Sequence, residues 1–294
     1  MLDRLFRQQG PNVDLHCHSV VSDGTLSPAD LVERAHRNGV DVLALTDHDE
    51  VAGLADAQAR AGELGLAFVP GVEVSVTWGG ETIHVVGLRI DFRDPALVAG
   101  LERTRTGRDD RAHEIAASLA SAGIPDAYEG ALRYAGNPEL VSRSHFARYI
   151  VETGACASVD EVLRRFLVEG KPGYVPHRWA QLADAVGWIR AAGGLAVLAH
   201  PGRYRLSDLC MDRMIEEFRD AGGEGIEVVS GSHTPDQYGE YAAVAQRFGL
   251  AASRGSDFHG PGESRHDLGS LPPLPRSLTP VWHDWPEAAI PERR

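Results

Sequence analysis

Short apolar runs alternate with helical patterns along most of this chain, and this alternation most strongly constrains its fold. A continuous apolar run such as Val40–Leu45 is typical of a buried parallel strand. Strands are expected at Val13–Leu15, Val40–Leu45, Leu66–Val69, Val72–Thr77, Thr82–Arg89, Leu195–Ala199, Gly225–Val229 and Leu250–Ser253. Helices are expected at Pro28–Asn38, Glu50–Leu64, Leu182–Ala192, Leu206–Asp220 and Pro235–Phe248. Repeated units of this kind predict an α/β fold whose mainly parallel sheet closes into a barrel.

Two stretches depart from the alternation. From about Asp94 to Ala180 the chain is rich in Arg, Ala and Glu, has helical periodicity and contains no convincing strand. We therefore expect residues 1–93 and 181–294 to form a discontinuous barrel and residues 94–180 to form a mainly helical insertion, which acts as a lid or substrate domain. The Pro-rich residues from about 270 onward are expected to run over the surface.

Composition limits the class of protein. The 294 residues carry a net charge of −13, which argues against a broad basic surface for long nucleic acid. No apolar run reaches the roughly 18–20 residues of a membrane span, and the N-terminus lacks the apolar core of a signal peptide. The three cysteines are far apart with no CxxC pair, which fits a reducing cytoplasm. We expect a cytoplasmic protein without membrane contact or an obligate protein partner.

His, Asp and Glu residues follow the expected strands one after another. His16 and His18 come after the first strand, and an i, i+2 spacing in an extended segment projects both imidazoles to one side. Asp257 and His259 repeat that spacing after the last strand. Because active sites of β/α barrels lie at the carboxyl ends of the strands, we expect these side chains to meet. The full candidate set is His16, His18, Asp23, His48, Glu73, His84, His200, Asp257 and His259.

Such a mixed set of ligands predicts a metal centre. A lone His at a strand end is usually a surface group, and Asp23-Gly24 alone would be read as a turn. The constellation as a whole is harder to explain without metal. Imidazole and carboxylate together suit Mn²⁺, Zn²⁺ or Fe²⁺. A cluster of two or three divalent ions would activate water and clamp a phosphoryl group, so the sequence favours a phosphoesterase.

Six motifs in this chain together resemble those of the PHP (polymerase and histidinol phosphatase) family. They are His16-Cys17-His18, Ser22-Asp23-Gly24, Thr46-Asp47-His48, Pro70-Gly71-Val72-Glu73, Leu198-Ala199-His200-Pro201 and Gly255-Ser256-Asp257-Phe258-His259. The resemblance implies a distorted seven-stranded β/α barrel with a trinuclear metal centre. It also implies a first metal on His16, His18, Glu73 and Asp257; a second on Glu73, His84 and His200; and a third on Asp23, His48 and His259. Some members carry His where this chain has Asp23, and the carboxylate weakens the case for Zn²⁺ over Mn²⁺ at the third site.

Two segments of the insertion resemble a subgroup of that family, the 3′,5′-nucleoside bisphosphate phosphatases. They are Ser142–Arg148 and Gly170–Pro176. The resemblance implies removal of the 3′-phosphate from a small nucleotide. Related members trim RNA as 5′→3′ exoribonucleases of the RNase AM type, so short RNA or DNA is a further expected substrate.

A substrate with two phosphates needs a second anion site, and Arg or Lys would supply it. The candidates are Arg143, Lys171 and Arg203, with Ser144 beside them; Lys171 is the only lysine among the 29 basic residues. For a general acid or a phosphate contact, His233 is a candidate because it follows a strand without being needed as a ligand, and His145 is the alternative.

Three other functions stay open at this stage. A phosphomonoesterase of the histidinol-phosphate type would share the metals but lack a second phosphate pocket. A metal-dependent amidohydrolase often bridges its metals with a carboxylated lysine at a strand end, whereas Lys171 lies in the insertion. A catalytically inactive barrel serving as a binding module would be expected to lose ligands, and all the candidates are present.

Overall fold

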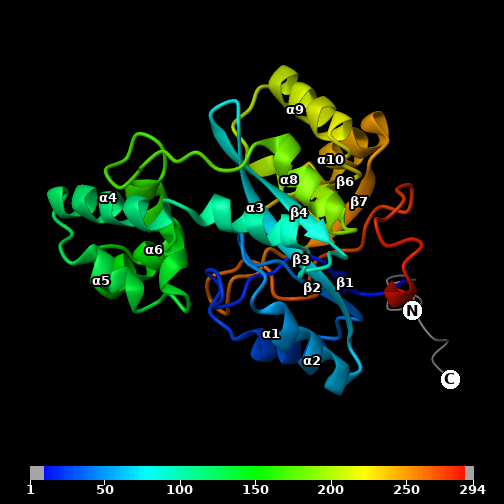
Figure 1. Cartoon of the computed structure of the whole chain (residues 1–294), viewed down its shortest axis with the longest axis horizontal. Helices are drawn as coiled ribbons and strands as arrows, with labels where there is room; N and C mark the ends of the chain where they lie inside the picture. Colours follow the sequence, from blue (N-terminus) through cyan, green and yellow to red (C-terminus); the bar gives the residue numbers. More distant parts are fainter. Residues whose placement is uncertain (1–9, 289–294) are drawn as a thin grey trace.

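The strands form a nearly closed barrel. The computed structural model describes residues 10–288, and within them seven strands follow one another around the sheet in chain order (Figure 1). The first and last strands approach each other, since the N–H of Leu15, just after the first strand, donates to the Arg254 carbonyl of the last strand at 3.0 Å. The strands are β1 (Val13–Asp14), β2 (Val42–Leu45), β3 (Ala67–Trp78), β4 (Glu81–Leu88), β5 (Leu195–Leu198), β6 (Gly225–Ser230) and β7 (Ala251–Gly255).

One strand runs against the others. β1, β2 and β3 pair in parallel, as do β5, β6 and β7, whereas β4 is antiparallel to both β3 and β5. A hairpin between β3 and β4, at the strands expected at Val72–Thr77 and Thr82–Arg89, accounts for this reversal. Its turn residues Gly79 and Gly80 have φ values of 58° and 88°, which side chains other than glycine rarely adopt. The structure therefore has a barrel of the predicted α/β class, distorted by one reversed strand.

The helices between the strands lie close to their predicted positions. They are α1 (Pro28–Arg37), α2 (Leu54–Leu64), α8 (Leu182–Ala191), α9 (Asp208–Asp220) and α10 (Pro235–Phe248). Ser27 caps α1 by accepting the Asp30 N–H, and Pro28 occupies the first turn. The prediction for α2 was wrong at its start, because Glu50 accepts the N–H groups of Val51 and Ala52 in a turn that precedes the helix.

β3 is a single strand where the sequence analysis expected two. It continues through Pro70 and Gly71, which had been interpreted as a break. A proline lacks an N–H but keeps its extended φ, so it is tolerated at a position where the ladder does not need that donor. The continuous strand carries Glu73 into the barrel mouth. His84 lies within β4, opposite Ser75, inside the strand expected at Thr82–Arg89.

The region from 94 to 180 is helical, with no strand in the part that the structure describes. It contains α3 (Pro95–Arg105), α4 (Arg108–Ser121), α5 (Ala127–Leu132), α6 (Arg143–Glu152), α7 (Val159–Val162) and a π-helical turn at Leu163–Leu167. Helices α4 to α6 form a lobe beside the barrel (Figure 1) with its own buried cluster around Phe146, Ile150 and Leu119. α3 differs, since its Leu97 and Leu101 belong to the barrel core.

The expectation that the Pro-rich C-terminal segment runs over the surface is wrong for part of it. The Ala252 N–H donates to the Thr279 carbonyl, and the Val281 N–H donates back to Ala252. Val281 and Trp285 are buried against the barrel strands. This part of the segment therefore pairs with the start of β7 and packs against strand residues of the barrel. None of the helices in residues 10–288 combines the length and apolar character that a membrane-spanning helix needs.

Candidate metal centre and anion pocket

The nine candidate ligands meet at one mouth of the barrel. Their side chains fall into four overlapping groups in which the potential ligand atoms all lie within 4.8 Å of one another. The groups are His18–Asp23–His48–His259, His16–Glu73–His200, His16–His18–Asp257 and His48–Glu73–His84. Seven of the nine follow the ends of β1, β2, β5 and β7, as the barrel geometry predicted. Glu73 and His84 lie within β3 and β4, and β6 contributes none.

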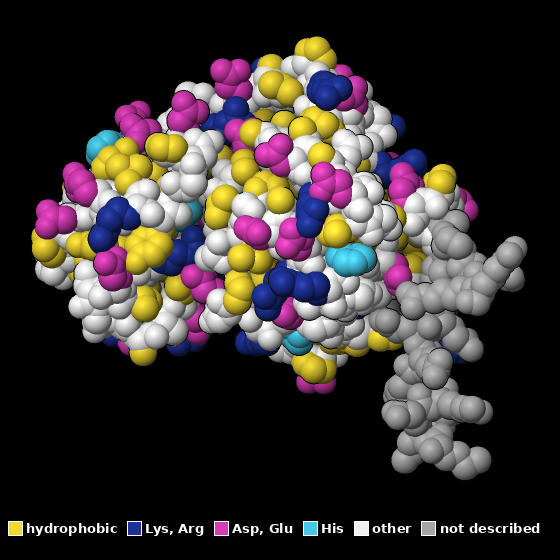
Figure 2. All heavy atoms as spheres, turned by 90° about the horizontal axis from the view of Figure 1, so that it is seen from below, with side chains coloured by type: hydrophobic (Ala, Val, Ile, Leu, Met, Phe, Trp, Pro, Cys, Tyr) yellow, Lys and Arg dark blue, Asp and Glu magenta, His cyan; other side chains and the backbone are white. Residues whose placement is uncertain are grey.

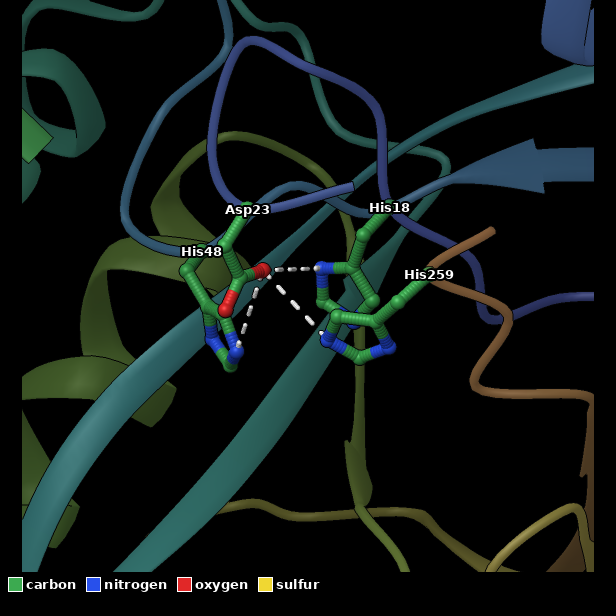
Figure 3. Close-up of side chains that lie close together, drawn as sticks. All are labelled: His18, Asp23, His48 and His259. Carbon is green, nitrogen blue, oxygen red and sulfur yellow. Dashed lines mark ion pairs between the residues drawn. The ribbon is translucent and has the colours of Figure 1, made fainter. Parts of the chain in front are cut away.

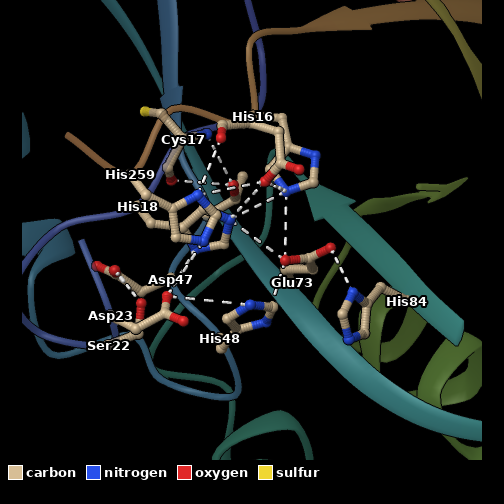
Figure 4. Close-up of polar contacts among 12 residues, drawn as sticks. His16, Cys17, His18, Ser22, Asp23, Asp47, His48, Glu73, His84 and His259 are labelled. Atoms are coloured by element: carbon tan, nitrogen blue, oxygen red, sulfur yellow. Dashed lines mark hydrogen bonds and ion pairs between the residues drawn. The ribbon is translucent and has the colours of Figure 1, made fainter. Parts of the chain in front are cut away.

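Glu73 lies at the centre of the cluster (Figure 4). Its Oε2 is 3.2 Å from His16 Nε2 and 3.3 Å from His18 Nε2. Its Oε1 is 3.0 Å from His84 Nδ1 and 2.9 Å from His200 Nε2. Oε2 also lies 3.0 Å from His48 Nδ1, so the two oxygens of one fully buried carboxylate face two different sets of imidazoles. This arrangement is the one that a bridging ligand between two metal ions requires.

A neighbouring group contains Asp23 with the imidazoles of His18, His48 and His259 (Figure 3). Oδ1 of Asp23 is 3.3 Å from His259 Nε2, 3.9 Å from His18 Nδ1 and 4.0 Å from His48 Nε2. His18 therefore faces two groups, since its Nε2 lies 3.3 Å from Asp257 Oδ1. The resemblance implied His18 only for the first metal, and the structure adds its second nitrogen to the surroundings of Asp23.

The polar atoms at the centre of the cluster fit divalent metal. Among the described residues, His18 Nδ1, Asp23 Oδ1, His48 Nδ1, Glu73 Oε2 and Asp257 Oδ1 are buried and make no hydrogen bond. A buried polar atom without a partner costs roughly 1–3 kcal/mol. Several such atoms converging on one space are explained by cations that coordinate them.

The carboxylates of the cluster are held in their ionised, ligating form. Burial alone would raise the pKa of Glu73, but the imidazoles of His84, His16 and His48 outweigh it and bring that pKa well below its usual value. Asp23 behaves likewise: burial opposes its ionisation, while His259 and His48 lower its pKa well below the ordinary range. These carboxylates can therefore bind cations without first losing a proton.

Glu227 is a functional residue that the sequence analysis missed. Its Oε1 accepts the Nδ1–H of His16 at 2.7 Å, and its Oε2 accepts the backbone N–H of His200 at 2.6 Å. This bond directs His16 Nε2 toward Glu73, as carboxylate–histidine–metal arrangements do. The available signal was a charged residue inside the apolar strand Gly225–Val229.

Two aspartates next to His48 hold the surrounding loops. Asp47 accepts hydrogen bonds from the Ser19 N–H and hydroxyl and from the Ser22 hydroxyl, which fixes the loop leading to Asp23. Asp49 accepts the N–H and hydroxyl of Ser75 and pairs with Arg108. The candidate ligand His48 therefore lies between Asp47, which holds the loop leading to Asp23, and Asp49, which bonds to Ser75 of β3.

A pocket of about 220 Å³ opens directly beside the metal cluster. His84 and His200 form part of its wall, and Arg143 and Arg203 form another part, so two of the predicted anion contacts line it. Arg203 Nη1 lies 3.1 Å from Asp257 Oδ2. Tyr174 is a further wall residue. Cationic side chains next to metal ligands suit a substrate that carries more than one anionic group.

The other two predicted anion contacts lie elsewhere. Lys171 is exposed, in a turn where its carbonyl accepts the Tyr174 N–H, and it is not among the residues that line the pocket. The hydroxyl of Ser144 donates to Asp23 Oδ2 at 3.0 Å. Of the four candidates, the structure brings Arg143 and Arg203 together at the pocket, while Ser144 contacts the metal cluster.

Both histidines considered for proton transfer are buried and engaged. His233 donates from Nδ1 to the Val228 carbonyl and accepts the Gly202 N–H at Nε2, each at 3.1 Å. His145 accepts the Ser142 N–H at Nδ1 as part of the cap of α6, and burial lowers its pKa to about 4. The His233 ring cannot donate its proton without losing a contact, so its geometry favours a positioning role. His145 differs, because its Nε2 is buried without a hydrogen-bond partner.

Charges of both signs are interspersed on the face of the molecule in Figure 2, with no broad patch of basic side chains there. The anionic substrate would instead be recognised at the pocket.

Comparison with known proteins is informative over almost the whole chain. Residues 14–192 match the PHP domain. The 3′,5′-nucleoside bisphosphate phosphatase of Chromobacterium violaceum is 52% identical, over 93% of this chain and 96% of that protein. The 5′-3′ exoribonuclease Rnm of Escherichia coli is 42% identical, over 92% of this chain and 93% of the relative. A solved structure of a Chromobacterium violaceum protein described as an amidohydrolase, with bound sulfate and no metal, has a TM-score of 0.90 at 52% identity; the alignment covers 92% of this chain and 94% of that one.

Proposed function

This chain belongs to the PHP domain family, and from that premise we propose that it is a metal-dependent phosphoric monoester hydrolase that removes the 3′-phosphate of nucleoside 3′,5′-bisphosphates. The observation that carries the proposal is the contact between two sites: the pocket lined by Arg143 and Arg203 shares His84 and His200 with the metal cluster. A substrate with two phosphates can place one at each site.

The cofactors are two or three divalent ions, with Mn²⁺ as the first candidate. His16, His18, Glu73 and Asp257 would hold the first ion, Glu73 with His84 and His200 the second, and Asp23 with His48 and His259 the third. Support comes from the close approach of the potential ligand atoms and from the five buried atoms among them, named above, that make no hydrogen bond. Bound ions of this kind activate water and neutralise the charge of a phosphoryl group.

The protein's own residues bind and orient. Glu227 fixes the tautomer and direction of His16, and Glu73 holds imidazoles on both of its sides. Arg143 and Arg203 would neutralise the phosphate that is not cleaved. Binding energy from this remote group can be used to orient the reacting phosphate, because a substrate held at both ends loses its freedom before the reaction.

The experiment that tests the function is a phosphate-release screen with Mn²⁺ on adenosine carrying a 5′-phosphate, a 3′-phosphate or both. We expect the bisphosphate to be the best substrate, with adenosine 5′-phosphate as the product. Equal kcat/KM for the bisphosphate and the 3′-monophosphate would contradict a second anion site. It would instead favour a general phosphomonoesterase of the histidinol-phosphate type.

An exonuclease activity is a second candidate, supported by the exoribonuclease relatives. An oligonucleotide with a 5′-phosphate offers the same pair of anionic groups as the bisphosphate, so the screen should include a short RNA. Amidohydrolase chemistry is less well supported, although one solved relative carries that description. The only lysine, Lys171, lies exposed in the insertion and offers no bridge between metals.

We also propose a reducing cytoplasm as the location. The three cysteines, Cys17, Cys156 and Cys210, are all free thiols in the structure. A nucleotide substrate is the proposed partner.

A further inference from the structure

The insertion contacts the Asp23 group through the first turn of α6. Oδ2 of Asp23 accepts hydrogen bonds from the Ser144 hydroxyl at 3.0 Å and from the Ser142 hydroxyl at 3.3 Å. Oδ1 of the same carboxylate makes no hydrogen bond and faces the imidazoles of His48 and His259. One oxygen is therefore held by the insertion, and the other is left for a cation.

One turn further along α6, Arg148 makes a second connection. Its side chain is only 6% exposed, and its Nη2 donates to the backbone carbonyl of Asp23 at 2.6 Å. Its Nε and Nη2 also donate to the two carboxylate oxygens of Glu263, each at 2.8 Å. Glu263 follows His259 by four residues in the same loop. Arg148 thus joins the loops that carry Asp23 and His259 to one helix of the insertion.

We propose that α6 is the positioning element of the third metal site, with Ser144 and Arg148 as the residues that hold Asp23 in place for the cation. This inference rests on the proposed metal centre but not on its substrate. Partners of a ligating carboxylate fix its orientation, and their loss typically weakens metal binding roughly 10–100-fold. Coupling is also reciprocal, so an ion at this site stabilises the turn that presents Arg143 to the pocket. Metal occupancy and anion recognition are linked through one helix.

The test measures Mn²⁺ binding directly, from the electron paramagnetic resonance signal of free Mn²⁺ during a titration. We compare the wild type with Ser144→Ala and Arg148→Lys. Ser144→Ala removes one half-buried hydroxyl and leaves the N-cap Ser142 intact, so it should fold even if Arg148→Lys does not. The matched control is Arg133→Ala, because Arg133 makes a similar two-pronged pair with Glu152 of α6, but on the exposed side of the helix.

We expect one of the bound Mn²⁺ ions to dissociate about 10–100-fold more readily in both variants, while the others and the control match the wild type. Hydrogen exchange should also show that Mn²⁺ slows exchange in the first turn of α6 in the wild type, and less so in Ser144→Ala. Unchanged Mn²⁺ affinity in a folded Ser144→Ala variant, or a wild type that never binds a third ion, overturns the proposal. If the Mn²⁺ results hold and the enzyme does not prefer bisphosphates, the proposed substrate fails and this inference stands.

Discussion

A buried carboxylate that touches no substrate can still determine the geometry of a metal site, and Glu227 is the example here. It is 1% exposed and bonds both to the ring of His16 and to the backbone of His200. These two residues belong to one of the candidate metal groups. At the scale of single residues, the site therefore depends on Glu227, which orients candidate ligands and is not itself among them.

We predict that Glu227→Gln weakens metal binding by roughly 10–100-fold, because the amide cannot hold the His16 ring as firmly as the charged carboxylate. The measurement is metal content after dialysis, together with the Mn²⁺ concentration that gives half-maximal activity. Glu224→Gln is the control, since Glu224 is exposed just before the same strand. If Glu227→Gln required no more Mn²⁺ than this control, Glu227 would be only a structural residue.

His233 supports a second prediction at this scale. Its Nε2 accepts the N–H of Gly202, while Gln237 donates to the carbonyl of the same residue at 3.1 Å. Gly202 is the central residue of the Pro201–Arg203 turn, so both its backbone N–H and its carbonyl are hydrogen-bonded. We predict that His233→Ala raises KM about tenfold, the loss expected for roughly 1.4 kcal/mol, and changes kcat much less. A large fall in kcat that removes the alkaline limb of the pH–rate profile would instead identify a general acid.

Among the secondary-structure elements, the contact between α3 and α8 shows how closely the chain packs. Gly100 of α3 lies against the Trp188 ring of α8, where an added Cβ would lie 2.3 Å from a ring carbon. Leu97 and Leu101 of α3 belong to the core of the barrel. This helix therefore packs with the barrel, even though it falls inside the range predicted for the insertion.

We predict that Gly100→Ala destabilises the protein by about 1–3 kcal/mol, the usual cost of overpacking. Gly187→Ala is the matched control on the partner helix, where an added Cβ meets nothing within 4 Å. That change should be neutral or stabilise by about 0.5–1 kcal/mol. Urea unfolding of both variants measures the difference, and similar midpoints would show that α3 can move away from Trp188.

The segments of the insertion support a prediction about specificity. Arg143 lines the pocket, whereas Lys171 lies in an exposed turn outside it. We predict that Arg143→Ala lowers kcat/KM for the bisphosphate about tenfold to a hundredfold, as expected for a charge-assisted hydrogen bond of roughly 1.5–3 kcal/mol. The loss on the 3′-monophosphate should be small. Lys171→Ala should have a smaller effect on the bisphosphate, and an equally large loss would mean that the turn closes over the substrate.

At the scale of the whole molecule, the candidate metal ligands bring distant segments of the barrel to one place. Its ligands come from loops and strands between His16 and His259, that is, from nearly the full length of the chain. Cations that bind only the folded state stabilise it, by about 2.7 kcal/mol per site at a hundredfold excess over Kd. We predict that a chelator abolishes activity and lowers Tm by on the order of 5 °C. Restoring Mn²⁺ should restore both. A Tm that the chelator leaves unchanged would mean that the cluster is held by protein contacts alone.

The sequence by itself determined the fold class and the set of candidate ligands, because both follow from local order along the chain. Apolar runs, caps such as Ser27 and the Gly79-Gly80 turn specify their elements within a few residues. The carboxyl ends of parallel strands must then meet at one mouth. Motif spacing was therefore enough to name the nine candidate ligands that come together there.

Only the tertiary structure decided which residues support that set. Glu227, Arg148 and the second nitrogen of His18 act through contacts between segments far apart in the chain, which no local pattern encodes. The same reason explains why Lys171 was expected in the pocket: its charge is visible in the sequence, but the direction of its turn is set by packing. The sequence shows which side chains can bind cations or anions. Their positions relative to the site depend on how distant segments pack against one another.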